Sequence, residues 1–244
     1  MVDEPSESTR RADEVRRTHD LIRERIRTGG MAPGETISQV QLAGELGVSR
    51  GPLREALRLL EREGFIEQEH NRRARVAPVS LSDLDQVYAM RITLEALAIT
   101  LATPLQTPAR LSRARELLAE MDDCIQNEDI DGWEGPHRAF HAALTAPAGP
   151  RLARELAALS DHADRYRRLA IESQPSILHH GVHEHAEILD AVEHGDGTQA
   201  ALLLAKHLGR VALIVGAMSD SLVELTAVRQ ALRTVERTAP DPPG

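Results

Sequence analysis

The first part of the chain shows the apolar spacing of helices separated by short breaks. Apolar positions recur at helical intervals among charged residues over about 13–28, and glycines and a proline over 29–34 interrupt that pattern. Ser38 followed by Gln41 forms a capping box, which predicts the start of a second helix. Gly47 is a suitable end for that helix.

A third helix is predicted directly afterwards, followed by two strands. Ser49 is a suitable N-cap, and Gly64 ends the helical pattern. The segments 65–69 and 74–79 then have strand character around a polar turn at 70–73. Three helices followed by a two-stranded hairpin is the element order of a winged helix-turn-helix.

The remainder of the chain shows helical periodicity and no strand signal. The pattern from 82 to 218 predicts six helices, and a final amphipathic segment covers about 220–237. The breaks fall at 104–108, 129–132, 146–150, 173–175 and 195–197. We therefore expect a mainly α protein with a winged helix-turn-helix domain over 10–78 and an all-α helical bundle over 80–237. Residues 1–10 and 238–244 are expected to be loose ends.

The predicted third helix has two distinct faces. Its apolar stripe consists of Leu53, Ala56, Leu57 and Leu60. Arg50, Arg54 and Arg58 form a second stripe about 110° away. A helix of this kind fits the major groove of DNA, where arginine pairs with guanine. The wing carries Arg72, Arg73 and Arg75, which suit contact with the backbone or minor groove. The alternative is a solvated arginine face that pairs with nearby glutamates.

This segment resembles the winged helix-turn-helix of GntR-type regulators. The matching residues are Pro33-Gly34, Leu42-Ala43, Leu46-Gly47-Val48-Ser49-Arg50, Pro52-Leu53-Arg54-Glu55-Ala56-Leu57, Leu60, Glu63 and Gly64. The resemblance implies that Ser49, Arg50 and Arg54 contact DNA and that His70 and Asn71 assist at the wing tip. Two residues depart from the pattern, because Gly51 stands where a threonine is usual and Arg73 where a wing glycine is usual.

Four histidines in the second part have spacings that suggest a shared site. His137 and His141 lie four apart and therefore share a face of one predicted helix. His185 and His207 each lie eleven residues from Asp196, so an antiparallel hairpin would place both about 15 Å from its turn. Bundle cores build metal sites in this way, and neutral imidazole suits zinc, nickel, copper or iron. The alternative is that each histidine is a surface or hydrogen-bonded core residue, as we expect for His179, His180, His183 and His194.

The same region resembles the helical effector (FCD) domain of FadR-type members of that family. The matching residues are His137-Arg138-Ala139-Phe140-His141, Glu184-His185, Ile188, Ala191-Val192, Gly195-Asp196 and His207-Leu208. The resemblance implies that His141, His185 and His207 are metal ligands. His137 replaces the usual aspartate, so the site loses a negative charge, which disfavours hard ions and makes zinc or nickel the expected divalent metal. Binding of an organic ligand without metal remains the alternative.

One arginine in the first helix of the bundle is a candidate for binding the effector. In similar proteins the arginine at the position of Arg91 points into the ligand pocket, which implies a small-molecule effector such as a carboxylate. An Arg91–Glu95 pair within the helix is the equal alternative. Arg165 and Arg168 are expected on a solvated face.

Charge and composition modify this picture only slightly. The net charge of −9 argues mildly against a nucleic-acid binder, but residues 1–78 carry 14 basic and 14 acidic side chains, so the acidity lies in the remainder. The single cysteine fits a reducing compartment, and the longest apolar run, 211–218, is too short to cross a membrane. We expect a cytoplasmic protein without a membrane partner.

Together these features predict a ligand-responsive transcriptional regulator, more specifically a repressor, that binds double-stranded operator DNA. A homodimer on an inverted repeat is expected, because symmetric half-sites match a two-fold protein. A metal-dependent enzyme that uses the histidine cluster is the alternative. We do not expect an enzyme, because the sequence shows no catalytic motif that would place a base or nucleophile beside the metal.

Overall fold

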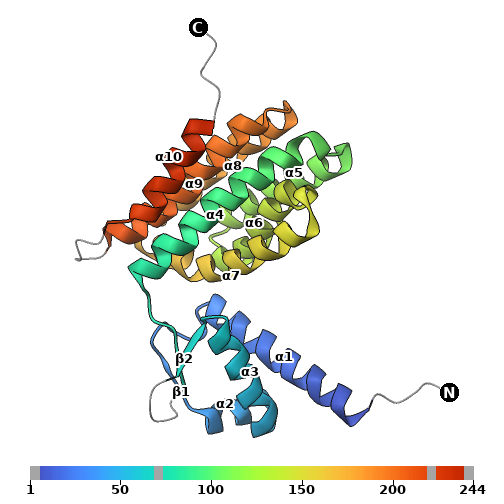
Figure 1. Ribbon diagram of the computed structural model, residues 1–244, viewed down its shortest axis with the longest axis vertical. Helices are drawn as coiled ribbons and strands as arrows, with labels where there is room; N and C mark the ends of the chain where they lie inside the picture. The colour runs from blue at the N-terminus through green and yellow to red at the C-terminus, as the bar shows by residue number, and fades with distance from the viewer. Residues whose placement is uncertain (1–5, 69–73, 219–223, 239–244) are drawn as a thin grey trace, which may run out of the picture. The chain divides into compact units, whose positions relative to one another are not determined.

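The structure is a computed structural model that describes residues 6–68, 74–218 and 224–238 (Figure 1). The chain divides into two compact units, Met1–Val79 and Ser80–Gly244. Each unit has its own hydrophobic core.

The N-terminal unit contains the predicted helices and strands. Its helices are α1 (Glu7–Arg27), α2 (Gln39–Leu46) and α3 (Arg50–Arg62), and its strands are β1 (Thr36–Ile37), β2 (Ile66–Gln68) and β3 (Ala74–Val76). The Ser38 hydroxyl accepts a hydrogen bond from the amide of Gln41, and Gly47 ends α2 in the left-handed conformation. The predicted winged helix-turn-helix order is confirmed.

Three features of this unit differ from the prediction. Helix α1 begins at Glu7 and not near 13, because the Ser6 side chain caps the amide of Thr9. The expectation that residues 1–10 are loose was therefore wrong from Ser6 onward. The two-residue strand β1 was not predicted, and it pairs antiparallel with β3 to give the sheet order β1-β3-β2.

The C-terminal unit is a helical bundle. Its helices are α4 (Leu81–Ala102), α5 (Pro108–Gln126), α6 (Ile130–Thr145), α7 (Pro150–Ser173), α8 (Ser176–Glu193), α9 (Gly197–Ala217) and α10 (Thr226–Thr238), with two short 3₁₀ turns at Thr103–Leu105 and Ala146–Ala148. The six helices predicted before 218 and the final amphipathic helix are confirmed. Four of these helices begin with a capping side chain, which accepts a hydrogen bond from the backbone amide three residues later. The capping residues are Ser80, Thr107, Asp129 and Asp196.

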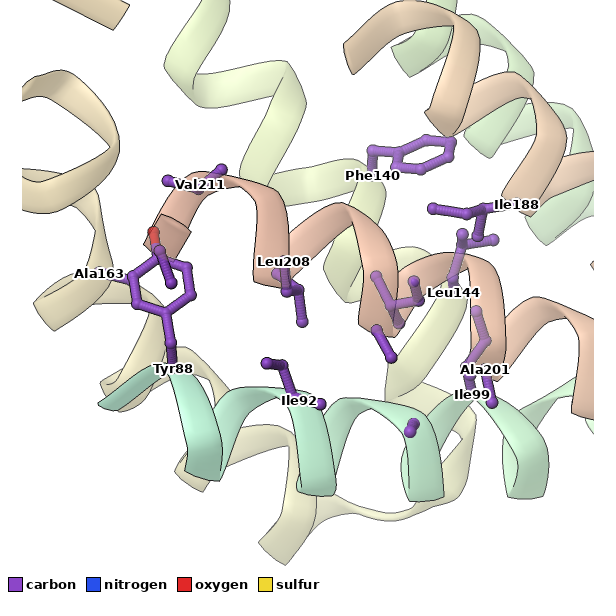
Figure 2. Packing of buried hydrophobic residues seen from close by; sticks show 14 of the residues in the cluster. Tyr88, Ile92, Ile99, Phe140, Leu144, Ala163, Ile188, Ala201, Leu208 and Val211 are labelled. Carbon is purple, nitrogen blue, oxygen red and sulfur yellow. The ribbon is translucent and has the colours of Figure 1, made fainter. Parts of the chain in front are cut away.

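Helices α4 and α9 run side by side through the core of this bundle (Figures 1 and 2). Tyr88 and Ile92 on α4 face Leu208 on α9, while Phe140 from α6 and Ile188 from α8 complete the apolar cluster (Figure 2). Because these side chains are closely packed, the helices cannot shift freely against one another. This packing thereby fixes the relative positions of polar residues carried on α4, α6, α8 and α9.

Helix α9 is long and apolar enough to cross a membrane if only length and composition are considered. Just over half of its most apolar window, 56%, is buried inside the bundle. A core helix of a soluble protein has the same properties, so α9 is explained by its place in the core.

Candidate nucleic-acid interface and candidate metal centre

Helix α3 separates its apolar and basic faces as the sequence predicted. Leu53, Leu57 and Leu60 are buried in the core of the N-terminal unit. Arg50, Arg54 and Arg58 are exposed and line one hollow on its surface. The three guanidinium groups therefore stay available to an outside partner while the leucines anchor the helix.

The same hollow contains residues of α2 that the sequence analysis did not select. Gln39 and Val40 line it together with Gln68 at the end of β2. Val40 is 64% exposed, which is unusual for a valine beside three arginines. An apolar group at such a place suits contact with a thymine methyl in the major groove. Only the exposed position of Val40 in the fold reveals it, because its sequence context is that of an ordinary helical valine.

The structure describes Ser49 and Arg58 among the remaining predicted DNA contacts, and these contacts stay predictions. Ser49 occupies the N-cap position of α3, but its side chain makes no capping hydrogen bond, contrary to the expectation that it caps the helix. Arg58 donates to Glu55 at 3.4 Å, and both side chains are exposed, so this ion pair contributes little stability. His70, Asn71, Arg72 and Arg73 lie outside the described residues.

The four selected histidines meet inside the bundle. His137 and His141 come from α6, His185 from α8 and His207 from α9, and all four are buried. One nitrogen of each ring lies within 4.8 Å of the corresponding nitrogens of the other three. The antiparallel α8–α9 hairpin brings the rings of His185 and His207 to a centroid distance of 4.4 Å, so the predicted convergence from three helices is confirmed.

Two glutamates orient the rings from outside the cluster. His141 donates from Nδ1 to Glu95 at 3.3 Å, and His207 donates from Nδ1 to Glu184 at 2.9 Å. These contacts leave the lone pair of each ring on Nε2, and the Nε2 of His141 faces that of His185. Carboxylates in this outer position fix the tautomer and raise the basicity of metal-binding imidazoles. Neither glutamate was predicted to have this role.

The surroundings of the cluster lower the pKa of three of its histidines. Burial lowers the pKa of His141 from 6.5 to about 4, although the hydrogen bond to Glu95 opposes the shift. Burial also lowers the pKa of His137 and His185 well below 6.5, and the positive charge of Arg167 adds to both shifts. These imidazoles are therefore neutral near pH 7, which is the form that binds a metal.

The geometry suits a divalent ion with nitrogen ligands. His141 and His185 place their Nε2 atoms 3.2 Å apart, close to the separation of about 3.4 Å between ligand nitrogens of a tetrahedral zinc site. Both ring nitrogens of His137 are buried without a hydrogen-bond partner. A buried polar atom without a partner is costly, and coordination would remove that cost. The four residues therefore fit a zinc or nickel ion.

Arg91 lies near the cluster but is engaged by a carboxylate. Its Nε donates to Glu95 at 2.7 Å, and both side chains are buried. Burial by itself would raise the pKa of Glu95, but the Arg91 charge and the His141 hydrogen bond outweigh it and lower that pKa from 4.5 to about 2. The Arg91–Glu95 ion pair considered from the sequence is thus present, and Glu95 links Arg91 to His141.

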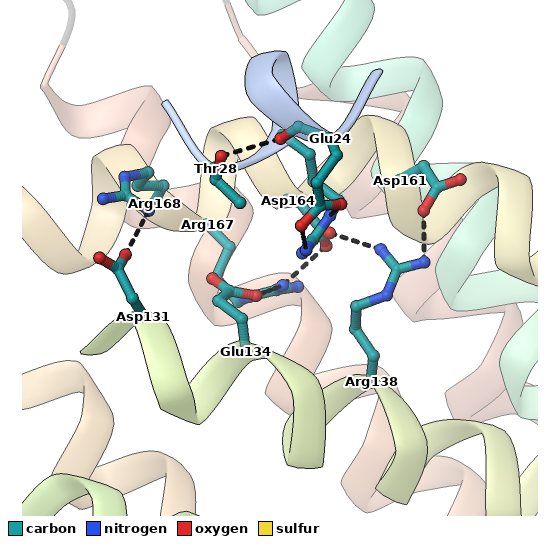
Figure 3. A network of polar contacts seen from close by, with 10 residues as sticks. Glu24, Thr28, Asp131, Glu134, Arg138, Asp161, Asp164, Arg167 and Arg168 are labelled. Atoms are coloured by element: carbon teal, nitrogen blue, oxygen red, sulfur yellow. Dashed lines mark hydrogen bonds and ion pairs between the residues drawn. The ribbon is translucent and has the colours of Figure 1, made fainter. Parts of the chain in front are cut away.

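Helix α7 supplies a buried arginine that the sequence analysis missed. Arg167 donates from Nη2 to Asp164 at 2.7 Å and contacts Glu134, while Arg138 contacts Asp161 and Asp164 (Figure 3). The Nε and Nη1 groups of Arg167 have no hydrogen-bond partner. Its Cζ lies 5.8 Å from the ring centroid of Trp133, and that ring stacks on His137 at 4.2 Å. Arg167 thus has two nitrogens without a hydrogen-bond partner, and its side chain lies over the tryptophan that stacks on His137.

Other residues considered earlier lie apart from this site. Arg165 is buried and donates to Asp83 at 2.5 Å, so its expected place on a solvated face was wrong. Arg168 is partly exposed and pairs with Asp131 at 3.0 Å. The four other histidines expected outside the cluster, His179, His180, His183 and His194, are exposed.

The buried imidazoles predict acid sensitivity of the metal-free protein. The unfolded chain protonates histidines below about pH 6.5, whereas the folded chain keeps His137, His141 and His185 neutral, so stability should fall as the pH falls from 6.5 toward 4. Glu95 acts in the same direction below about pH 4.5. We expect His137→Asn to reduce the slope of unfolding free energy against pH by about 1.4 kcal/mol per pH unit below about pH 5.5. Urea unfolding followed by circular dichroism in chelator measures this slope.

His183→Asn is the matched control for this experiment, because it makes the same substitution at an exposed histidine. It should leave the slope unchanged. An unchanged slope in His137→Asn as well would mean that the His137 ring takes up its proton in the folded state.

Comparison with known proteins finds the same two-part organisation. Residues 15–76 match the family profile described as bacterial regulatory proteins, gntR family, and residues 86–210 match the FCD domain. The chain is 31% identical over 194 residues to the Nta operon transcriptional regulator of Aminobacter aminovorans, covering 77% of this chain and 90% of that protein. It is 28% identical over 198 residues to the HTH-type transcriptional repressor GlaR of Escherichia coli (strain K12), covering 78% and 88% respectively.

A solved structure supports the fold. The structure of McbR/YncC from E. coli superposes with a TM-score of 0.75 at 22% sequence identity, covering 84% of this chain and 98% of the other. This similarity concerns the arrangement of the helices and strands alone.

Proposed function

As a member of the GntR family of bacterial regulatory proteins with an FCD domain, this chain is a transcriptional regulator, and we propose that it represses transcription until a small organic acid binds beside a metal held by its four histidines. The observation that supports the sensor most strongly is the buried cluster of His137, His141, His185 and His207. Zinc or nickel is the proposed ion, because the ligands are all imidazoles. When bound, the ion supplies a positive charge that attracts an anionic oxygen.

We propose that Arg167 holds the carboxylate of the effector. Its Nε and Nη1 groups have no hydrogen-bond partner, whereas Nη2 is held by Glu134 and Asp164, and its positive charge acts on the cluster by lowering the pKa of His137. Arginine binds carboxylates through charge-assisted hydrogen bonds, and either free nitrogen can donate one. Arg91, the residue selected from the sequence, would act through Glu95 by holding the ring of His141 in place.

The contacts of Glu95 and Glu184 support a sensor over an enzyme. A metal-dependent hydrolase needs a base beside the bound water. Both carboxylates instead accept hydrogen bonds from the outer nitrogens of histidines. Their role is to position ligands, which is what a binding site requires.

We propose that DNA reading involves the exposed arginine stripe of α3 and a homodimer on an inverted repeat. Helix α4 offers a surface for self-association, because Met90, Leu97 and Leu101 are each about half exposed. The exposed positions of this helix carry no charged side chain: Ser82, Gln86, Met90, Thr93, Leu97, Thr100 and Leu101. Depletion of charge is typical of interface cores, and two copies of an acidic domain approach most easily through an uncharged face.

The proposed function predicts release of DNA by an acid in the presence of metal. Zinc- or nickel-loaded protein should bind a fragment from its own upstream region as two chains per site, measured by sedimentation. A thermal-shift screen of small carboxylates should identify acids that stabilise the loaded protein more than the metal-free protein. The same acids should lower the affinity for the fragment by about 5- to 150-fold, a typical range for allosteric coupling.

Two results would reject the sensor proposal. One is that the protein binds no zinc or nickel at micromolar concentrations. The other is that every acid stabilises the loaded and metal-free protein equally, since a ligand without differential affinity cannot shift an equilibrium.

A further inference from the structure

Gly51 lies in the first turn of α3. Gly51 lies about 60° from Arg54 and about 20° from Arg58 around the helix axis, at the edge of the arginine stripe. Its φ is not positive, so the backbone does not require a glycine there. A threonine occupies this position in the pattern that the segment resembles. Gly51 thus removes a hydroxyl from the DNA-reading surface for no local conformational reason.

A guanidinium group from another helix lies next to this glycine. A Cβ built on Gly51 would lie 3.5 Å from Nη2 of Arg11. Apart from the two chain neighbours of Gly51 and the nearby backbone of α3, no other described atom would lie within 4 Å of that Cβ. Arg11 belongs to the first turns of α1, which begins earlier than the sequence indicated, and its side chain is exposed. Helix α1 packs along α3, which holds this part of α1 beside the first turn of α3.

An ion pair with the acidic residue of the adjoining groove does not account for this placement. Glu55 lines the same α1–α3 groove as Arg11, but its carboxylate pairs with Arg58. Arginine offers five donors in a planar fork that suits a phosphate oxygen pair. The chain therefore presents a positive donor at the place where the pattern that the segment resembles has a neutral hydroxyl.

We propose that Arg11 contacts the DNA backbone from α1 and stands in for the side chain that Gly51 lacks. The inference rests on the DNA-binding role of α3 and concerns a different helix. A contact of this kind adds one neutralised phosphate to the interface. It orients the protein on the duplex without reading a base.

The test uses full-length protein, a duplex from its own upstream region and a scrambled duplex of equal length, with binding measured by fluorescence anisotropy over a series of salt concentrations. Arg11→Ala should weaken binding to both duplexes by about fivefold. It should also reduce the slope of log affinity against log salt by about 0.9. Gly51→Thr in the Arg11→Ala background should recover part of the affinity, while the slope stays reduced because a hydroxyl carries no charge.

Arg17→Ala is the matched control, because Arg17 is exposed on the same helix about 240° around its axis from Arg11. It removes the same charge but should leave the salt slope unchanged. The inference is overturned if Arg11→Ala and Arg17→Ala have equal affinities and slopes, or if Gly51→Thr has the same effect with and without Arg11. If wild-type protein binds neither duplex, the DNA-binding role itself fails, which is a separate outcome.

Discussion

Replacing Arg50 and Arg54 together with alanine is expected to weaken operator binding by about 30-fold to 10⁴-fold. Both guanidinium groups are exposed on one face of a helix whose leucines are buried, so the substitutions should leave the fold intact. Each arginine that pairs with a guanine contributes about 1–3 kcal/mol of discrimination, and two such losses give this range. Anisotropy titrations with operator and scrambled duplexes measure the effect.

Graded variants make this prediction sharper. Arg54→Lys keeps the charge but loses the fork, so binding to scrambled DNA should be retained while discrimination falls. Arg58→Ala should have the smallest effect, because Arg58 already pairs with Glu55. If Arg54→Lys binds both duplexes as the wild type does, with no loss of discrimination, the stripe contributes only charge and reads no bases.

Replacing His185 and His207 together with asparagine is expected to abolish stabilisation by zinc or nickel. At a free metal concentration 100 times the dissociation constant, binding stabilises the folded state by about 2.7 kcal/mol. For a protein of this size that corresponds to a rise in melting temperature of roughly 5–10 °C in the wild type, and we expect none in the variant. DNA binding without effector should be retained, because both histidines belong to the C-terminal unit.

Three further variants separate metal binding from folding. His183→Asn removes an exposed histidine on the same helix as His185 and should bind metal normally. Glu184→Gln keeps all four imidazoles but weakens the support of His207, so metal affinity should fall about 10- to 100-fold. His137→Asp should raise the affinity for manganese relative to zinc, because a carboxylate suits harder ions. Retained metal stabilisation in the double variant would place the ion elsewhere.

The sequence predicted those parts of the structure that depend on short-range spacing. The two faces of α3 follow from residues three and four apart, and the meeting of His185 and His207 follows from equal distances to one turn. These relations hold within a helix or a hairpin. Strand β1 escaped prediction because two residues carry no periodicity and are held only by pairing with a distant strand.

The buried charges of α7 escaped prediction for a related reason. Asp161, Asp164, Arg165 and Arg167 read along the sequence as a solvated face. They are buried because Glu134 and Arg138 on α6 neutralise Arg167, Asp161 and Asp164 (Figure 3). Asp83 in the first turn of α4 neutralises Arg165. Burial of a charge depends on a partner that is distant in the sequence, and periodicity carries no information about that partner.

The stacking of Trp133 on His137 has a practical consequence. Trp133 is the sole tryptophan of the chain, and its ring lies 4.2 Å from that of a proposed ligand and close to Arg167. All tryptophan fluorescence of the protein therefore comes from a ring that stacks on a proposed metal ligand. The fluorescence of the unlabelled protein should therefore report metal binding directly. Because the histidine variants all retain Trp133, their metal titrations can be compared with that of the wild type.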